Sequence, residues 1–230
     1  MADRLFPSPD YPTVPAGDGL YPVHRIFCVG RNYAEHAAEM GVEVDREAPF
    51  YFMKDAQSLV ASGATTPYPP GTENYHYEME LVMAIGAPVF RASAEAARAA
   101  IWGYGCGFDM TRRDLQQAAR NKQRPWDLGK NVEASAVMTG LVPAADVGEI
   151  GPQRIWLSVN GETKQDAHLS DLVWSPVELV EHLSRYYHLA PGDLIYTGTP
   201  AGVGAVKAGD VIRGGIDGLP DVELTLGQPE

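Results

Sequence analysis

Short apolar segments recur along the whole chain, and their spacing predicts strands more often than helices. Strands are expected at RIFCVG (25–30), PFYFMK (49–54), HYEMELVMAIG (76–86) and WGYGCGFDM (102–110), and residues 191–226 have the pattern of short β-runs between Gly-rich turns. Since strands outnumber helices and do not alternate regularly with them, the pattern predicts a mixed α+β fold with mainly antiparallel sheet. A doubly wound parallel sheet fits this order of segments less well.

Capping patterns mark four helices between these strands. Their N-cap residues are expected to be Asn32, Ser93, Thr111 and Ser175. The clearest pattern is SPVE at 175–178, in which Pro176 occupies the first turn and Glu178 closes a capping box. The pattern therefore predicts short helices that flank the sheet.

Composition indicates a globular protein with one large domain. The 230 residues are 45% hydrophobic and 21% charged, and residues 1–22, rich in Pro and Gly, are expected to form an extended arm ahead of a single domain over 23–230. No apolar run has the length of a membrane span, and prolines interrupt the N-terminal segment where a secretory signal needs apolar residues. A cytoplasmic protein is the default expectation, in which Cys28 and Cys106 are buried, reduced thiols.

The net charge restricts the class of partner. The chain has 18 Lys and Arg against 30 Asp and Glu, a formal charge of −12. This balance argues against a nucleic acid or an anionic membrane as the main partner. An anionic small substrate remains compatible with it, provided that basic residues cluster locally around a binding site.

The predicted strand at 76–86 carries two carboxylates on one face. His76, Glu78 and Glu80 are expected to point to the same side of this strand, next to an apolar core. Two like charges are unfavourable there unless a cation lies between them or their protons stay on. Asp109, on the Gly face of the strand at 102–110, is a candidate third ligand. Three carboxylates without a usable cysteine suit Mg²⁺ or Mn²⁺ better than zinc or copper. The alternative is a solvated edge strand and a turn aspartate.

A histidine and a glutamate share one face of the first predicted helix. His36 and Glu39 are three residues apart, so their side chains are neighbours. A carboxylate beside an imidazole fixes its tautomer and raises its pKa, which prepares a general base. A surface His–Glu pair on an ordinary helix is the alternative.

Basic residues at the ends of apolar runs are candidates for binding an anion. They include Arg31, Lys54, Arg113 and Lys130, although a solvated position is the ordinary one for each of them taken alone. The segment TGTPAGVG at 197–204 can offer backbone N–H groups to an anion. It lacks the G-K-[ST] of a Walker loop, which argues against a kinase or nucleotidase.

Six motifs in this order resemble the fumarylacetoacetate hydrolase family. They are FCVGRNYAEHAAEMG (27–41), PFYFMK (49–54), HYEMELVMAIG (76–86), WGYGCGFDMTRRDLQ (102–116), RPWDLGK (124–130) and GDLIYTGTPAGVG (192–204). The resemblance covers the chain from about residue 22 onward and, within the family, is closest to hydrolases of acylpyruvates. It implies a β-sandwich roll with short flanking helices, assembled as a homodimer.

The resemblance also assigns roles to positions that match the family's motifs. The metal carboxylates fall on Glu78, Glu80 and Asp109, after a His76 that opens an H-x-E-x-E motif, and they imply one Mg²⁺ or Mn²⁺ per subunit. The catalytic groups fall on His36, Glu39 and Lys130, and the substrate pocket on Arg31, Lys54, Arg113, Gln116 and Thr199.

The reaction implied by the resemblance is hydrolysis of a carbon–carbon bond in a 2,4-diketo acid, an acylpyruvate such as fumarylpyruvate. The cation would stabilise the pyruvate enolate that leaves, while His36 activates water and Lys130 stabilises the oxyanion. Isomerases and oxaloacetate decarboxylases of the family use the same site, so these activities stay open. A non-catalytic, metal-stabilised binding or scaffold protein is the alternative from another class.

Two positions depart from the family pattern. Asp55 follows Lys54 where these proteins commonly carry Pro, and Asn131 begins a segment after Lys130 that differs from the usual one. Asp55 is expected to make its loop more mobile and to neutralise Lys54 in part. Both departures lie where selectivity for the acyl group could be set.

Overall fold

Strands form most of the regular secondary structure, as the apolar pattern predicts. The computed structural model describes residues 5–6, 10–39, 41 and 46–230. Its strands are β1 (Thr13–Ala16), β2 (Gly19–Pro22), β3 (Arg25–Gly30), β4 (Phe50–Lys54), β5 (Leu59–Ala61), β6 (Ala64–Thr66), β7 (Tyr75–Tyr77), β8 (Met79–Ile85), β9 (Ile101–Asp109), β10 (Thr111–Arg112), β11 (Ala136–Met138), β12 (Val142–Pro143), β13 (Arg154–Val159), β14 (Glu162–His168), β15 (Asp193–Tyr196), β16 (Gly204–Val206), β17 (Val211–Ile216) and β18 (Val222–Leu226). The strands expected at 25–30, 49–54 and 102–110 are β3, β4 and β9.

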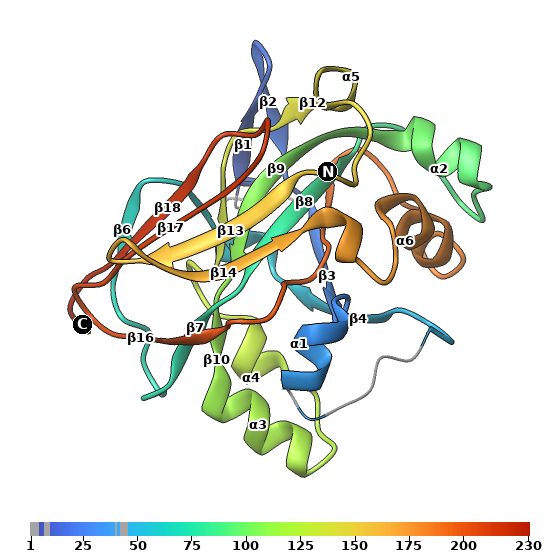
Figure 1. Ribbon diagram of the computed structural model, residues 1–230. Coiled ribbons are helices and arrows are strands. Elements are labelled where there is room, and N and C mark those ends of the chain that lie inside the picture. The colour runs from blue at the N-terminus through green and yellow to red at the C-terminus, as the bar shows by residue number, and fades with distance from the viewer. Residues whose placement is uncertain (1–4, 7–9, 40, 42–45) are drawn as a thin grey trace.

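Short helices lie around the sheets (Figure 1). They are α1 (Ala34–Glu39), α2 (Ala94–Ala100), α3 (Arg113–Asn121), α4 (Asp127–Lys130), α5 (Ala144–Val147) and α6 (Pro176–Leu183), with the 3₁₀ turns η1 (Ala56–Ser58) and η2 (Leu169–Asp171). In the part of the chain that the structure describes, no helix combines the length and the apolar character needed to cross a lipid bilayer.

The strands are arranged in four sheets within the described residues. An eight-stranded sheet has the order β4-β3-β15-β8-β9-β11-β5, with β12 beside β9, and a five-stranded sheet has the order β14-β13-β17-β18-β6. A three-stranded sheet, β10-β7-β16, and the hairpin β1-β2 complete the set. Most neighbours are antiparallel, and the parallel pairs are β3 with β15, β5 with β11 and β6 with β18. The predicted mixed, mainly antiparallel α+β fold is confirmed.

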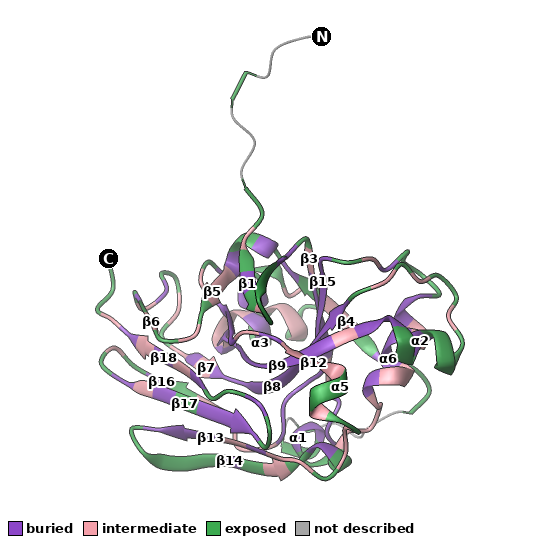
Figure 2. Ribbon diagram, turned by 90° about the horizontal axis from the view of Figure 1, so that it is seen from above, coloured by how far each residue is buried: buried purple, intermediate pink, exposed green. Residues whose placement is uncertain are grey.

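The larger apolar core lies between the five-stranded and the eight-stranded sheets (Figure 2). Met79 of β8 and Phe108 of β9 contact Gly214 of β17, where a Cβ atom would lie 2.6 Å from Met79 Sδ. Because a side chain at this position would push the sheets apart, the glycine permits their close approach. The packing holds β8 and β9 in place, and these strands carry two of the candidate metal ligands.

The N-terminal segment differs from the extended arm expected over 1–22. Residues 13–22 form the hairpin β1–β2, with Gly17 in the left-handed region at φ 56° in its turn. The Tyr21 hydroxyl donates to the Ile85 carbonyl (2.8 Å), and its ring belongs to a second core on the other face of the eight-stranded sheet. Alternating apolar residues therefore anchor this part of the chain, while 1–4 and 7–9 lie outside the described residues.

The strand expected at 76–86 is interrupted at Glu78. Its first part, β7, pairs with β10 and β16, whereas its second part, β8, pairs with β9 and β15. The chain thus passes from one sheet to another at Glu78, which the alternation of polar and apolar residues does not reveal. His76 and Glu80 consequently belong to different sheets, and the expectation that they share one strand face with Glu78 was wrong.

Two of the four predicted N-caps are confirmed. Ser93 accepts a hydrogen bond from Ala96 N–H, and Ser175 with Glu178 forms a reciprocal capping box at the start of α6. The cap predicted at Thr111 was wrong, because Thr111 lies in β10 and its hydroxyl donates to the Asp109 carbonyl. Helix α3 begins at Arg113 without a side-chain cap.

Asn32 was also wrongly predicted to be a helix cap. Its side-chain amide donates to the carbonyl groups of Thr197 (2.8 Å) and Trp174 (3.0 Å), and its Oδ1 accepts from Trp174 N–H (2.7 Å). The side chain is fully buried. Asn32 therefore joins the segment before α1 to the segment before α6 and to the end of β15, beside the candidate site described below.

We expect Asn32→Ala to lower the free energy of unfolding by about 3 kcal/mol, because it leaves buried backbone groups of Trp174 and Thr197 without partners. Urea denaturation followed by circular dichroism measures this loss. Asn121→Ala is the matched control on an exposed helix end, and its effect should stay within about 0.5 kcal/mol. A loss below about 1 kcal/mol for Asn32→Ala would contradict the bridging role.

Candidate active site

The three predicted metal carboxylates converge in the structure. Glu78 lies between β7 and β8, Glu80 lies on β8, and Asp109 ends the neighbouring strand β9. One carboxylate oxygen of each residue lies within 4.8 Å of those of the other two, and all three residues are buried. The antiparallel pairing explains the proximity, because Asp109 N–H donates to the Glu78 carbonyl (2.9 Å) and Glu80 is opposite Gly107.

Glycines on β9 allow the close packing expected from its bare face. A Cβ atom at Gly107 would lie 2.7 Å from side-chain atoms of Val82 and Tyr196, and one at Gly103 would lie 2.3 Å from the Val142 carbonyl oxygen. Any larger residue would displace these neighbours. The strand that ends in Asp109 is therefore held tightly against β8 and β12.

Buried cations surround the carboxylates. Lys130 Nζ donates to Glu78 Oε2 and to Asp109 Oδ2, both at 2.7 Å, and Arg113 forms an ion pair with Glu78 Oε1. Lys54 Nζ lies 2.9 Å from Asp109 Oδ1. These positive groups offset the charge of the carboxylates, which burial alone would make unfavourable.

The surrounding charges act differently on the two glutamates. Burial raises the pKa of Glu78, but Lys130, Arg113 and His36 outweigh it, so the pKa of Glu78 lies below its usual value. Burial and then the neighbouring Asp109 and Glu78 carboxylates hold the pKa of Glu80 well above its usual value. Glu80 therefore gains more than Glu78 from an added positive charge.

The donor set fits a hard divalent cation. Lys54 directs its protons to the Met110 carbonyl, the Lys130 carbonyl and Ser135 Oγ, so Asp109 Oδ1 is buried without a hydrogen bond among the described residues. This oxygen is ion-paired with Lys54 but accepts no hydrogen bond from any residue that the structure describes, so it can still serve as a ligand. Cys28 and Cys106 are free and buried as expected, and burial first, then the Asp109 charge, raises the pKa of the Cys28 thiol well above its usual value. A protonated thiol does not serve as a soft-metal ligand.

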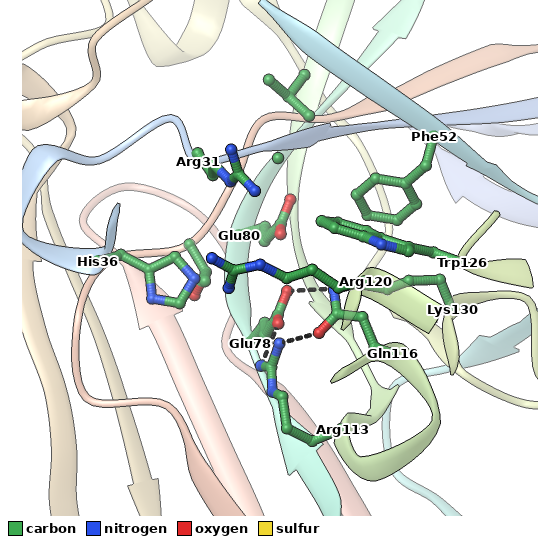
Figure 3. A pocket seen from close by; sticks show the side chains of 13 residues that line it. Arg31, His36, Phe52, Glu78, Glu80, Arg113, Gln116, Arg120, Trp126 and Lys130 are labelled. Carbon is green, nitrogen blue, oxygen red and sulfur yellow. Dashed lines mark hydrogen bonds and ion pairs between the residues drawn. The ribbon is translucent and has the colours of Figure 1, made fainter. Parts of the chain in front are cut away.

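The predicted His–Glu pair is formed. His36 Nδ1 lies 3.1 Å from Glu39 Oε2, and Gly202 N–H donates to the same carboxylate (3.3 Å). His36 is buried and lines a pocket together with Glu78 and Glu80 (Figure 3). Glu39 thus holds one ring nitrogen, and the ring is placed beside the carboxylates rather than in solvent.

His76, the first residue of the H-x-E-x-E motif, lies outside the triad. Its Nε2 is paired with Asn74 Oδ1 (2.8 Å), and its Nδ1 accepts from Arg113 Nε (3.4 Å). Burial first, and then the Arg113 charge, lower the pKa of His76 to about 4. The imidazole is therefore neutral near pH 7, and it helps to orient the guanidinium group that pairs with Glu78.

Most of the predicted site residues line the same pocket. They are Arg31, His36, Glu78, Glu80, Arg113, Gln116, Lys130 and Thr199. Asp109 and Glu39 stand behind this lining, as ligand candidate and as partner of His36 respectively. The pocket thus brings the candidate metal, acid–base and substrate groups together.

Lys54 does not lie where a substrate-binding residue must lie. Its side chain is fully buried, and its ammonium group is surrounded by the Met110 and Lys130 carbonyls, Ser135 Oγ and Asp109. The prediction that Lys54 binds a substrate carboxylate is therefore corrected. As the last residue of β4 it projects into the protein and supplies a fixed positive charge beneath the triad.

The loop after β15 closes the other side of the triad. Gly198 N–H donates to Glu80 Oε2 (2.7 Å), and Gly198 has φ 98°, where a Cβ atom would lie 2.8 Å from Asn32 Cβ. Glycine is therefore required at this position. Thr199 Oγ1 accepts from Gln165 Nε2 (2.9 Å), which fixes the hydroxyl group in the pocket.

Phe52, Arg120 and Trp126 are among the lining residues that were missed in the sequence. Arg120 is four residues after Gln116 and seven after Arg113. Helical spacing therefore places Arg113, Gln116 and Arg120 on one face of α3. That spacing was the available signal. The sequence offered no such signal for Phe52 and Trp126, because an aromatic side chain is ordinarily part of a core.

The two departures from the family pattern contact each other. Asp55 N–H donates to the Asn131 side-chain oxygen (2.7 Å), and the Asp55 carboxylate accepts from Gln57 N–H, which caps the turn η1. Asp55 is exposed and makes these contacts instead of neutralising Lys54, so that expectation was wrong. The pair joins the segment after β4 to the segment after α4 behind the pocket.

Comparisons with known proteins find relatives in both sequence and structure. A family model described as fumarylacetoacetate (FAA) hydrolase C-terminal matches residues 25–226. The chain is 54% identical to a fumarylpyruvate hydrolase of Ralstonia sp. over 193 residues, covering 83% of this chain and 100% of that protein. It is 37% identical to the mitochondrial oxaloacetate tautomerase FAHD1 of Homo sapiens over 206 residues, covering 90% and 93%. The crystal structure of fumarylpyruvate hydrolase from Pseudomonas aeruginosa in complex with Mn²⁺ and pyruvate matches with a TM-score of 0.94 and 45% identity, covering 98% of this chain and 100% of that one.

Proposed function

Because the chain belongs to the fumarylacetoacetate hydrolase family, we propose that it hydrolyses a carbon–carbon bond in a 2,4-diketo acid. The substrate class is the acylpyruvates, and the preferred substrate is fumarylpyruvate, which gives fumarate and pyruvate. The observation that carries this proposal is the convergence of Glu78, Glu80 and Asp109 in one pocket with the His36–Glu39 pair. The relative of 54% identity, a fumarylpyruvate hydrolase, supports the choice of substrate.

The cofactor of this proposal is one Mg²⁺ or Mn²⁺ per subunit, held by Glu78, Glu80 and Asp109. Hard oxygen ligands favour these two ions, and the Pseudomonas aeruginosa relative was crystallised with Mn²⁺. When bound, the cation supplies Lewis-acid stabilisation of negative charge on the oxygens of the diketo acid. The Asp109 oxygen that accepts no hydrogen bond within the described part of the chain and the elevated pKa of Glu80 support a cation at this place.

The acid–base chemistry falls to His36. With Nδ1 fixed by Glu39, the other ring nitrogen takes a proton from water, and the hydroxide attacks the distal carbonyl carbon of the substrate. Two N–H donors of Lys130 are used by Glu78 and Asp109, and the third is available for the oxyanion that forms. When the carbon–carbon bond breaks, the carboxylic acid leaves, and the pyruvate enolate takes back a proton at carbon to give pyruvate.

Oxaloacetate chemistry is the second candidate. The human oxaloacetate tautomerase and an oxaloacetate decarboxylase of Dictyostelium discoideum are both 37% identical to this chain. Enolisation of a 2-keto acid uses the same cation site and the same base, so the pocket is chemically suited to both reactions. The identity of 54% to a fumarylpyruvate hydrolase gives C–C hydrolysis the stronger support.

A direct comparison of substrates tests the proposal. Metal-stripped protein is reconstituted with Mg²⁺ or Mn²⁺, and the loss of enol absorbance is followed with fumarylpyruvate, with a short-chain acylpyruvate and with oxaloacetate. We expect kcat/KM for fumarylpyruvate to exceed that for oxaloacetate by at least about 100-fold, since only the diketo acid has the bond to be hydrolysed. Turnover of oxaloacetate alone would assign the second candidate, and turnover of none of them would favour a scaffold role.

We also propose a cytoplasmic homodimer. Strand β4 is the terminal strand of the eight-stranded sheet, and large apolar side chains on β4 and on α4 are exposed: Phe50 at 42%, Met53 at 41% and Leu128 at 72%. An edge strand with exposed apolar residues is a surface that a second subunit can cover, and Met53 and Leu128, which lie outside the aromatic wall of the pocket, are the side chains proposed for that contact.

A further inference from the structure

The cations that line the pocket come from different places in the fold. Arg113 is paired with Glu78, and Lys130 is paired with Glu78 and Asp109, so these two offset the charge of the triad. Arg31 and Arg120 also line the pocket, but they come from other positions, the end of β3 and the last turn of α3. A chain of net charge −12 thus places two further guanidinium groups at its candidate substrate site.

The two arginines are held close to each other. Arg31 has φ 59°, in the left-handed region that non-glycine residues seldom adopt, and its guanidinium carbon lies 5.8 Å from the centre of the Phe50 ring. Figure 3 shows the Arg31 and Arg120 side chains both directed into the pocket. Burial first, and then the Arg120 charge, lower the pKa of Arg31. Two like charges in one partly buried pocket favour the binding of an anion between them.

An aromatic wall continues the pocket away from the triad. The Trp126 ring lies 5.0 Å from the Phe50 ring and 6.0 Å from the Phe52 ring, measured between centroids. These side chains line an adjoining cleft of about 520 Å³, which shares Arg31 and Arg120 with the pocket. A flat, conjugated acyl group can lie along this wall with its far end at the arginines.

We propose that Arg31 and Arg120 form a carboxylate-binding pair that selects acylpyruvates whose acyl group ends in a second carboxylate. The pyruvate end of the substrate lies at the triad, the acyl group lies along Phe52 and Trp126, and the terminal carboxylate lies between the two guanidinium groups. This inference rests on the proposed function, because it concerns the acyl group of the same substrate. Lys54 and Arg113 form ion pairs with Asp109 and Glu78, and they therefore stay beside the pyruvate end of the substrate.

Substrate discrimination in arginine variants tests the pair. Values of kcat/KM are measured for fumarylpyruvate and for acetylpyruvate, which lacks the second carboxylate, with Arg120→Leu, Arg31→Leu and Arg120→Lys at saturating Mn²⁺. We expect the ratio of the two values to fall about 100-fold in each leucine variant, mainly through KM, and to recover in part in Arg120→Lys. Arg98→Leu, which removes the same charge from an exposed helix position, should leave the ratio unchanged.

The outcomes separate this inference from the proposed function. An unchanged ratio in both leucine variants overturns the pair, even where the enzyme still cleaves acylpyruvates. If the wild-type protein cleaves neither substrate, the proposed function is wrong. The arginine pair is then tested separately, by measuring the binding of dicarboxylate and monocarboxylate ligands. Calorimetry with fumarate and with crotonate, which carries a methyl group in place of one carboxylate, should give at least about tenfold tighter binding of fumarate. Equal binding of the two, or a preference that Arg120→Leu leaves intact, would overturn the pair.

Discussion

Glu80→Gln should reduce turnover of 2,4-diketo acids by at least about 10³-fold, because it removes one of the three proposed carboxylate ligands and the cation is expected to supply several kcal/mol of transition-state stabilisation. The substitution keeps the shape of the side chain, and its amide oxygen can still accept from Gly198 N–H. The loss therefore reports on charge and ligation rather than on packing. Steady-state kinetics at saturating Mg²⁺ or Mn²⁺ measure it.

The melting temperature gives a second measurement for Glu80→Gln. At free metal a hundred times its Kd, binding raises the free energy of unfolding of the wild-type protein by about 2.7 kcal/mol, and the variant should lose most of this gain. Without metal, the variant should be at least as stable as the wild type, because Glu80 is buried beside two other carboxylates. Glu95→Gln, on an exposed helix position, is the matched control. Undiminished turnover by Glu80→Gln would contradict the assignment of the triad.

This pair of measurements also tests the scaffold alternative. A metal-stabilised protein without catalytic function predicts that loss of a ligand lowers the metal-dependent melting temperature while no diketo acid is turned over by the wild type. An enzyme predicts that both the metal-dependent stability and the turnover are lost together. The carboxylates alone do not decide between these cases, since buried ion clusters occur in both.

The candidate site was predictable from the sequence where local periodicity determines the geometry. Glu78 and Glu80 are two positions apart in an extended segment, and His36 and Glu39 are three positions apart in a helix, so local geometry brings the two members of each pair together. Asp109 was found because it ends a strand with a bare glycine face. The resemblance to a family then related these local pairs to one another, which periodicity within a segment cannot do.

Predictions from the local sequence pattern were wrong where a side chain contacts a segment that is distant in the sequence. Asn32 has the position of a helix cap, but it bonds Trp174 and Thr197, which lie 142 and 165 residues further along the chain. Lys54 follows an apolar run as a substrate-binding lysine would, yet the direction of the last residue of β4 places it under Asp109. In both cases the deciding contacts are between segments far apart in sequence, where propensity carries no information.

The passage of the chain between sheets at Glu78 is the clearest example. Alternation predicts one strand over 76–86, and a single strand would place His76 beside the two glutamates. Instead β7 and β8 belong to different sheets, and Glu78 lies at the junction, where Lys130 and Arg113 reach its two oxygens. The metal candidate and the substrate pocket therefore meet at an irregularity of the sheet, which is a common place for functional residues.

His36→Ala should lower kcat by about 10³-fold, the range expected for loss of a positioned general base, while leaving the cation bound. The imidazole lines the pocket with Glu78 and Glu80 but is not part of the carboxylate cluster, so the metal-dependent rise in melting temperature should persist. Glu39→Gln keeps the side-chain shape but removes the charge beside Nδ1, and we expect a smaller loss, of about tenfold. His188→Ala, on an exposed position, is the control for the loss of an imidazole. If His36→Ala released the metal as well, the ring would have to be reassigned as a ligand; if it kept the wild-type rate, another group would have to activate the water.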